Sequence, residues 1–580
     1  MISGCRPLGL LLLVVACTSG QIGDPSLPYQ PAGSTTTAPT GSTGPFKGGA
    51  SGSSANNGTG SVNEPEPGKP GTSLTVGLAV AKLRKLTVEQ YRNSVNDVLG
   101  GGITVPTDLE ADTAQNGFYA IGASNATISP AAAEKLERAA YNVAAQALAP
   151  ARRASLVPCT PSGVSDNACA RKFVEKVGRK AFRRPLTDAE AARYALVGQQ
   201  AAEKLSDFHA GLEFALAGLL QSPQFLFRAE LGEQDPAQST RVRYTQYELA
   251  ARLAYAVWNT TPDDALLTAA EGGKLDAAGL ATQADRLLAD ARARTALDNF
   301  HSERLGLTEL ATLEKDASVI AAVTPELRTA LRDDVLRTFA EYSTGDTKDF
   351  LDVFDTRVTF VNAALADVYG LTTKPATLTR VELPANTPRL GLVGKPAFLA
   401  LNAHGSETSP TLRGKYMRER FLCESIAAPP PNVVTVLAEP DPSAPTMRDR
   451  LRAHASDPGC AACHTRMDPL GLALEHFDPI GRYRETDDGH KLDTTGDLDG
   501  DKFDGAVELA QLLRDDPRSA ECVVRQAYRY TLGHVENTNE EAQVAALVER
   551  FDAEGHKLQS LFKALIASDA FRYAAKAVTP

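Results

Sequence analysis

The sequence has few of the residues and motifs that mark many common protein classes. Its 580 residues include one tryptophan and four methionines. No apolar run reaches the ~20 residues that span a bilayer, so no transmembrane helix is predicted. There is no Walker loop, no GxSxG elbow, no HExxH motif and no GxGxxG motif between a strand and a helix. The net charge of −11 disfavours nucleic acid as a partner, because a polyanion binder needs a basic face.

Length and periodicity predict a mainly α, multi-domain fold: a helical body with a C-terminal cytochrome-c-like helical region. A chain of 580 residues is longer than a single hydrophobic core can serve. Capping boxes at 87–90, 187–190 and 245–248 predict helix starts, and the first of these helices should end at Gly100. Strand patterns are scarce, and the best are Leu378 to Leu383 and Val433 to Leu437.

The predicted organisation has seven parts. They are a signal peptide (1–17), a disordered Gly/Ser/Thr/Pro-rich linker (18–78), an N-terminal helical domain (79–150), a helical domain with Cys159 and Cys169 (151–230), a central helical domain (231–345), a CxxCH-containing domain (346–495) and a C-terminal helical domain (496–580).

The N-terminus predicts a lipoprotein. An apolar run from Leu8 to Val15 leads into Val14-Val15-Ala16-Cys17, which is similar to a bacterial lipobox. Cleavage before Cys17 would leave it for acylation, and Thr18 favours sorting to the outer membrane. We therefore expect a lipid-anchored protein that faces the periplasm or the cell surface. The alternative is an ordinary secretory signal in which Cys17 is incidental.

The segment Cys460-Ala461-Ala462-Cys463-His464 has the spacing of a c-type haem attachment site. The two thiols would bind the haem covalently, and neutral His464 would ligate the iron. A disulfide, free thiols or a zinc site are the alternatives, the last with His454 or His476 as a further ligand. The presence of only one CxxC disfavours zinc.

The sixth iron ligand would decide the chemistry, because a methionine or histidine there makes an electron carrier and an open position admits a small molecule. Met467 lies too near His464 in sequence to be a strong candidate. The other candidates are Met447, Met417, His404, His454, His490 and His534.

The remaining cysteines are even in number. Cys159 can pair with Cys169 across a short loop, and Cys423 with Cys522 over a long range, with free buried thiols as the alternative. The acidic run from Asp497 to Asp501 is similar to a calcium loop, but Lys502 replaces the required glycine, so a solvated loop is favoured. We expect Arg183, Arg184, Arg413 and Lys415 to pair with carboxylates rather than with an anionic substrate.

Several phrases together resemble a family of large exported bacterial proteins, best known from planctomycetes and also found in myxobacteria. These proteins consist of successive domains of unknown function around a cytochrome-c-like segment. The phrases lie at 84–100, 181–187, 222–228, 247–250 with Trp258 and 262–264, 408–410 with 413–415, and 460–464 continuing through 467–471, 477–478 and 481–482. One departure is Leu532-Gly533-His534, where the family usually has arginine in place of the histidine.

The resemblance implies an architecture more than a reaction. We expect one covalent haem c, used in electron transfer with a redox partner protein or in a haem-linked oxidation. The alternative is a non-catalytic surface binding or scaffold lipoprotein, related to polysaccharide, with a structural CxxCH. The residues do not decide whether the protein is an enzyme.

Overall fold

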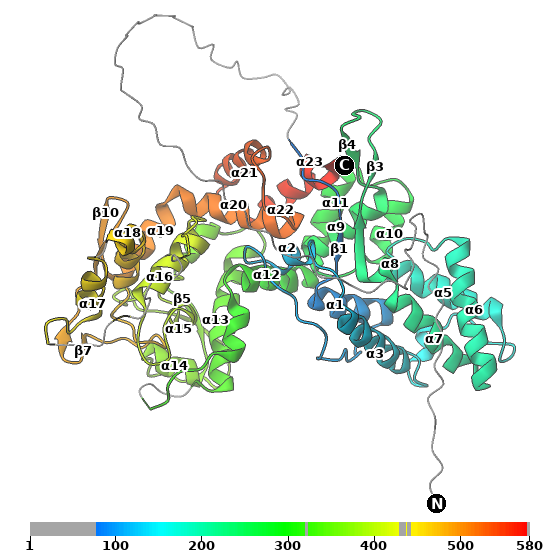
Figure 1. The fold of residues 1–580 in the computed structure, drawn as a ribbon, viewed down its shortest axis with the longest axis horizontal. Helices are drawn as coiled ribbons and strands as arrows, with labels where there is room; N and C mark the ends of the chain where they lie inside the picture. The colour runs from blue at the N-terminus through cyan, green and yellow to red at the C-terminus, as the bar shows by residue number, and fades with distance from the viewer. Residues whose placement is uncertain (1–76, 319–322, 429–436, 438–441, 457, 577–580) are drawn as a thin grey trace, which may run out of the picture. The chain divides into compact units, whose positions relative to one another are not determined.

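The computed structural model describes residues 77–318, 323–428, 437, 442–456 and 458–576, without the side chains of residues 453, 454 and 458 (Figure 1). The predictions for Cys17, for the linker up to residue 76, for the side chain of His454 and for most of the strand at 433–437 lie outside the described residues. Helices dominate the rest, which confirms the mainly α fold.

The first part of the chain, up to residue 230, is a set of helices flanked by two short strands. Thr87 caps the first helix through a complete capping box, and Gly100 ends it with φ 88°, as predicted. The elements are β1 (Lys82–Lys85), α1 (Val88–Leu99), α2 (Tyr119–Ala123), α3 (Pro130–Ala147), α4 (Arg153–Leu156), α5 (Asn167–Ala181), α6 (Asp188–Leu205), α7 (Phe208–Gln221), α8 (Pro223–Leu226) and β2 (Phe227–Glu230).

The central part is also helical. Its first long helix, α9, begins with the capping box predicted at Thr245, and α6 in the preceding part begins with the one predicted at Thr187. Both predictions are confirmed. The elements are β3 (Glu233–Gln234), β4 (Arg241–Arg243), α9 (Gln246–Trp258), α10 (Asp264–Glu271), α11 (Ala277–Leu288), α12 (Ala291–Arg304), η1 (Leu307–Thr312), α13 (Pro325–Ser343) and η2 (Phe350–Val353).

The next part contains the CxxCH segment. The predicted strand at 378–383 forms as β6 and pairs with β5 in antiparallel register. The elements are β5 (Val358–Val361), α14 (Ala363–Tyr369), β6 (Thr379–Glu382), α15 (Pro396–Leu401), α16 (Pro410–Tyr416), η3 (Met417–Phe421), α17 (Met447–His454), α18 (Pro458–Leu472), β7 (Thr486–Asp487), β8 (His490–Lys491), β9 (Thr495–Leu498) and β10 (Asp501–Asp504).

The C-terminal elements return to the central part. Strand β11 adds to β4 and β3 to make a three-stranded antiparallel sheet. The elements are α19 (Gly505–Asp515), α20 (Pro517–Leu532), α21 (Glu541–Ala553), α22 (Leu558–Ala567), α23 (Asp569–Arg572) and β11 (Tyr573–Ala575). Among the helices of the described residues, none combines the length and the apolarity needed to cross a bilayer.

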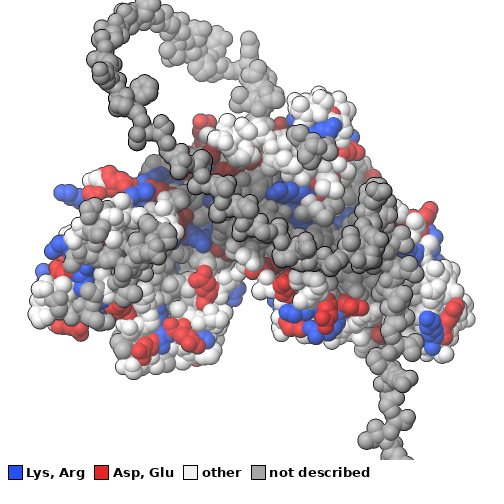
Figure 2. Space-filling view, in the orientation of Figure 1, with Lys and Arg blue, Asp and Glu red and all other residues white. Residues whose placement is uncertain are grey.

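Two large apolar cores hold most of these helices. One draws on residues from Leu86 to Tyr255, and the larger one on residues from Phe118 to Ala574. On the described part of the surface in Figure 2, acidic and basic side chains are interspersed.

A buried ionic cluster ties together β1, β2 and α9. Glu230 is 1% exposed and pairs with Arg84 at 3.2 Å, with Arg228 at 3.3 Å and with Arg252. Burial opposes its ionisation, but the three guanidinium groups hold the pKa of Glu230 at about 2. Arg252 also donates to the carbonyl of Phe571, which joins the C-terminal end to the cluster.

The arginines of the resemblance phrases are mostly buried. Arg184 pairs with Glu190 at 2.8 Å, as expected. The expectation for Arg183 is wrong, because its guanidinium donates to the backbone carbonyls of residues 224, 225 and 227 and to the hydroxyl of Tyr255. These carbonyls lie at the end of α8, where a helix has acceptors without intrahelical partners.

Both predicted disulfides form. Cys159 and Cys169 close a short loop, and Cys423 and Cys522 join the end of η3 to α20 across 99 residues of sequence.

The two disulfides should contribute unequally to stability, because a cross-link restricts the unfolded chain more when it closes a longer loop. We predict that the Cys423→Ser/Cys522→Ser variant loses about 5 kcal/mol of unfolding free energy and the Cys159→Ser/Cys169→Ser variant about 3 kcal/mol. Denaturant unfolding of the two matched variants measures the difference. An equal or larger loss from the short loop would contradict this prediction.

Candidate haem-binding site

The CxxCH segment lies on helix α18, which begins at Pro458. Cys460, Cys463 and His464 are three and four positions apart, a spacing that places side chains on one face of a helix. Both thiols are unpaired and half-buried. The site therefore presents two reduced sulfur atoms and one imidazole along a single helical face.

The imidazole of His464 is oriented by a carboxylate one turn later. Its Nδ1 lies 2.9 Å from Oδ2 of Asp468 on the same helix. Asp468 is 6% exposed, and its Oδ1 accepts a hydrogen bond of 2.8 Å from the hydroxyl of Thr411 on α16. A carboxylate at Nδ1 favours the tautomer with its proton there, so Nε2 presents the lone pair that a metal needs.

Helix α18 packs against α16 with its backbone almost in contact. A Cβ atom at Gly414 would lie 1.8 Å from the carbonyl oxygen of Met467, and one at Gly471 would lie 1.9 Å from that of Pro410. No side chain fits at either distance, so glycine is required at both positions. This close contact sets the position of α18 along the axis of α16.

Arg413 on α16 secures the chain just after α18. Its guanidinium is fully buried and donates to the backbone carbonyls of residues 474, 477 and 478, and it lies 3.5 Å from Glu475. Burial lowers the pKa of Arg413 to about 10 and raises the pKa of Glu475. The hydroxyl of Thr408 donates to Glu475 at 2.9 Å. The expected pairing of Arg413 with a carboxylate is confirmed.

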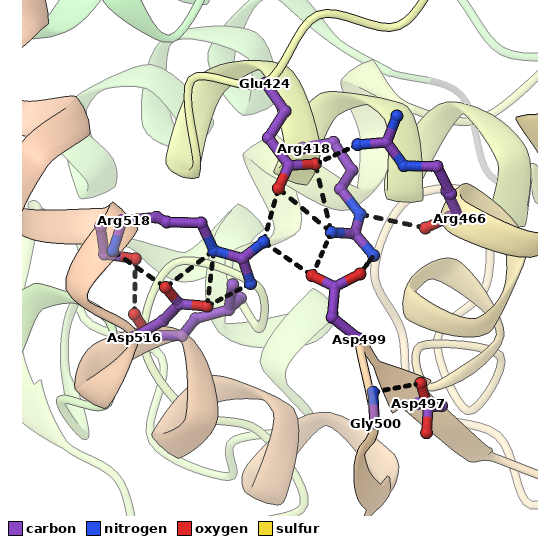
Figure 3. Close-up of polar contacts among 10 residues, drawn as sticks. Arg418, Glu424, Arg466, Asp497, Asp499, Gly500, Asp516 and Arg518 are labelled. Atoms are coloured by element: carbon purple, nitrogen blue, oxygen red, sulfur yellow. Dashed lines mark hydrogen bonds and ion pairs between the residues drawn. The ribbon is translucent and has the colours of Figure 1, made fainter. Parts of the chain in front are cut away.

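A second ionic network holds the middle of α18 (Figure 3). Arg418, whose side chain is 2% exposed, donates to the carbonyl of Arg466 at 3.1 Å and pairs with Glu424 and Asp499. Arg466 also pairs with Glu424, at 2.7 Å. Arg518 on α20 pairs with Asp499 at 2.6 Å, so the network joins α18 to the C-terminal helices.

This network also explains the acidic run at 497–501. The run covers the end of β9, the turn at residues 499–500 and the first residue of β10, and Asp497 accepts a hydrogen bond from the backbone N–H of Gly500. Hydrogen bonds from Arg418 and Arg518 hold the pKa of Asp499 at about 2. In the described part of the chain, no three His, Cys, Asp or Glu side chains are placed to hold a metal ion together.

The candidates for the sixth ligand have different environments. Met417 is fully buried in the larger core, and Met467 is 5% exposed on α18 itself. Met447 packs with Leu451 and Leu472, so it lies where α17 contacts α18. His404 and His490 are exposed. Met447 is thus the candidate that the packing brings against the CxxCH helix.

The sixth-ligand candidate His534 and the zinc-ligand candidate His476 have partners within the protein. His534 Nε2 lies 3.0 Å from the buried carboxylate of Glu540. His476 Nδ1 lies 2.8 Å from the carbonyl oxygen of Arg484.

Asp468 and Thr411 are the site residues that the sequence analysis missed. The spacing of four between His464 and Asp468 on a predicted helix was a usable signal, because such pairs meet on one face. Thr411 is 57 residues away from Asp468 in sequence and had no such signal.

These features define a mainly helical, multi-domain protein in which the helix that carries a CxxCH motif packs closely against a second helix. Five successive segments match family models, each described as a protein of unknown function: residues 84–149 (DUF1587), 169–230 (DUF1595), 244–371 (DUF1592), 389–487 (DUF1588) and 499–571 (DUF1585). The chain is thus a multi-domain protein of five domains of unknown function, and α18 lies within the segment 389–487. No curated protein and no solved structure matches it.

Arg418 should stabilise the α18 region far more than Arg466. We predict that Arg418→Met lowers the unfolding free energy by about 2 kcal/mol, because it removes a buried cation that pairs with Glu424 and Asp499. The loss is moderate because both carboxylates still pair with other arginines. The control Arg466→Met removes a half-exposed cation from the same network and should cost about 0–1 kcal/mol. Thermal and denaturant unfolding measure both, and equal losses would contradict the prediction.

Proposed function

We propose that this protein binds one covalent haem c at α18 and transfers electrons outside the cytoplasm. Cys460 and Cys463 would form the thioether links, and His464 would bind the iron through Nε2. When bound, the haem supplies a one-electron iron couple. The observation that carries the proposal is the single helical face with two unpaired thiols and an imidazole hydrogen-bonded through Nδ1 to Asp468.

The residues present fit this group. The thiols are half-buried, so each has accessible surface for a covalent link. The other four cysteines outside the predicted signal peptide are joined in two disulfides. The α16 contact and Arg413 would keep the helical face in place when the two sulfur atoms are modified.

The chain's disulfides support a location outside the cytoplasm, because such bonds persist in oxidising compartments. We propose acylation at Cys17 and an outer-membrane anchor that faces the periplasm or the cell surface. The electron partner would be a redox protein, or a substrate oxidised at the helical domains.

Expression with a cytochrome maturation system tests haem binding. We predict a haem-staining band that survives denaturing electrophoresis and partitions with membranes. The Cys460→Ala/Cys463→Ala variant should lose the stain, whereas Cys159→Ala/Cys169→Ala should keep it. A colourless wild-type protein beside a control cytochrome that matures normally would overturn the proposal and favour the scaffold alternative.

Asp468 should tune the haem as a positioning residue. Its negative charge at Nδ1 strengthens the imidazole as a donor, which favours the oxidised iron. We predict that Asp468→Asn raises the reduction potential by tens of millivolts, where ~59 mV is a tenfold change for one electron. Asp497→Asn makes the same charge change in strand β9 and should shift the potential far less. Equal shifts in a spectroelectrochemical titration would contradict a specific role for Asp468.

A further inference from the structure

A pocket opens to solvent where α16 and η3 meet the end of α15 and the residues that follow α12. Its volume is about 200 Å³. A cavity of ~150 Å³ is enough to hold benzene, so this pocket has room for a small organic molecule. Part of its wall is η3, which is a π-helix, a rare conformation that occurs often at functional sites.

One buried polar group in the wall lacks a partner. Asn402 is 8% exposed, and its Nδ2 donates to the carbonyl of Phe398 at 2.9 Å. Within the described residues, its Oδ1 accepts no hydrogen bond. Buried side-chain oxygens are nearly always paired, so this one is open to a donor from solvent or from a ligand.

Two charges in the wall lack ion-pair partners. Four charged side chains line the pocket, two of each sign. Lys415 and Glu419 lie 3.8 Å apart and neutralise each other. The side chain of Arg420 donates only to the carbonyl of Arg304, and neither Arg420 nor Glu309 forms an ion pair with any residue that the structure describes. The pocket thus offers one unpaired guanidinium and one unpaired carboxylate.

Both unpaired charges act on the same hydroxyl. Burial raises the pKa of Tyr416, whereas Arg420 lowers it and Glu309 raises it further. The Tyr416 hydroxyl itself donates to the carbonyl of Leu305 at 2.8 Å, so it is already satisfied. The guanidinium and the carboxylate therefore lie in the wall of one small pocket without pairing with each other.

This arrangement indicates the chemistry of a ligand. A guanidinium group binds a carboxylate through two parallel hydrogen bonds. A carboxylate and an amide oxygen accept hydrogen bonds from an ammonium group, which has three donors. The charges in the wall sum to zero, which favours a ligand without net charge. The leucine side chains of the wall suit an aliphatic group, and they are Leu305, Leu401 and Leu412.

We propose that this pocket binds a small zwitterion of the α-amino-acid class with an aliphatic side chain. Arg420 binds its carboxylate, and Glu309 and the Oδ1 of Asn402 accept hydrogen bonds from its ammonium group. No residue of the CxxCH site lines the pocket, so the proposal does not depend on haem binding.

Calorimetric titration of the full chain tests the proposal with three probes of matched shape. L-leucine carries both charges, 4-methylpentanoate lacks the ammonium group and 3-methylbutylamine lacks the carboxylate. We expect L-leucine to bind at one site. Each analogue should bind about 10-fold more weakly, because it leaves one charged group of the pocket unpaired.

Two variants separate the charges. Arg420→Met should weaken L-leucine and 4-methylpentanoate about 10-fold without weakening 3-methylbutylamine. Glu309→Gln should weaken L-leucine and 3-methylbutylamine without weakening 4-methylpentanoate. The controls Arg337→Met and Glu314→Gln make the same charge changes at exposed positions on α13 and after η1, and they should alter no probe.

Thermal unfolding checks that each variant is folded, and the change at the exposed Glu309 keeps the test valid if Arg420→Met does not fold. Absence of L-leucine binding to the wild type would overturn the proposal. So would analogues that bind as tightly as L-leucine, or variants that weaken all three probes equally.

Discussion

The close contact of α16 with α18 is the constraint on which the candidate site depends. Gly414 and Gly471 let the two backbones touch, and Arg413 then holds the carbonyls that follow α18. A larger residue at either glycine would push the helices apart and draw Thr411 away from Asp468. The orientation of His464 therefore depends on packing against α16, which lies more than 40 residues earlier in the sequence.

Several buried arginines connect segments of this protein that are separate in the sequence. Arg252 joins Glu230 to the C-terminal end, Arg183 binds the carbonyls after α8, and Arg418 links α18 to the β9–β10 turn. Guanidinium suits this role because it stays charged and has several donors in a fixed plane. Three arginines of the resemblance phrases take part in such contacts: Arg183 at α8, and Arg84 and Arg228 around Glu230.

Local sequence signals predicted the fold well. The capping boxes at Thr87, Thr187 and Thr245 act within four residues, and both disulfides were predicted from an even count of cysteines in a chain expected to be exported. What the sequence could not predict depends on distant partners. Arg183 was expected to pair with a carboxylate, but its guanidinium donates to backbone carbonyls at the end of α8 instead. The predicted domain boundaries stay predictions.

The central claim is that the two thiols of α18 hold a haem. Intact-protein mass spectrometry of the exported, mature protein tests it most directly, combined with alkylation of free thiols. The account predicts a mass that exceeds the polypeptide and its lipid by one haem, with Cys460 and Cys463 resistant to alkylation. A mass without haem, with both cysteines alkylated, would contradict it.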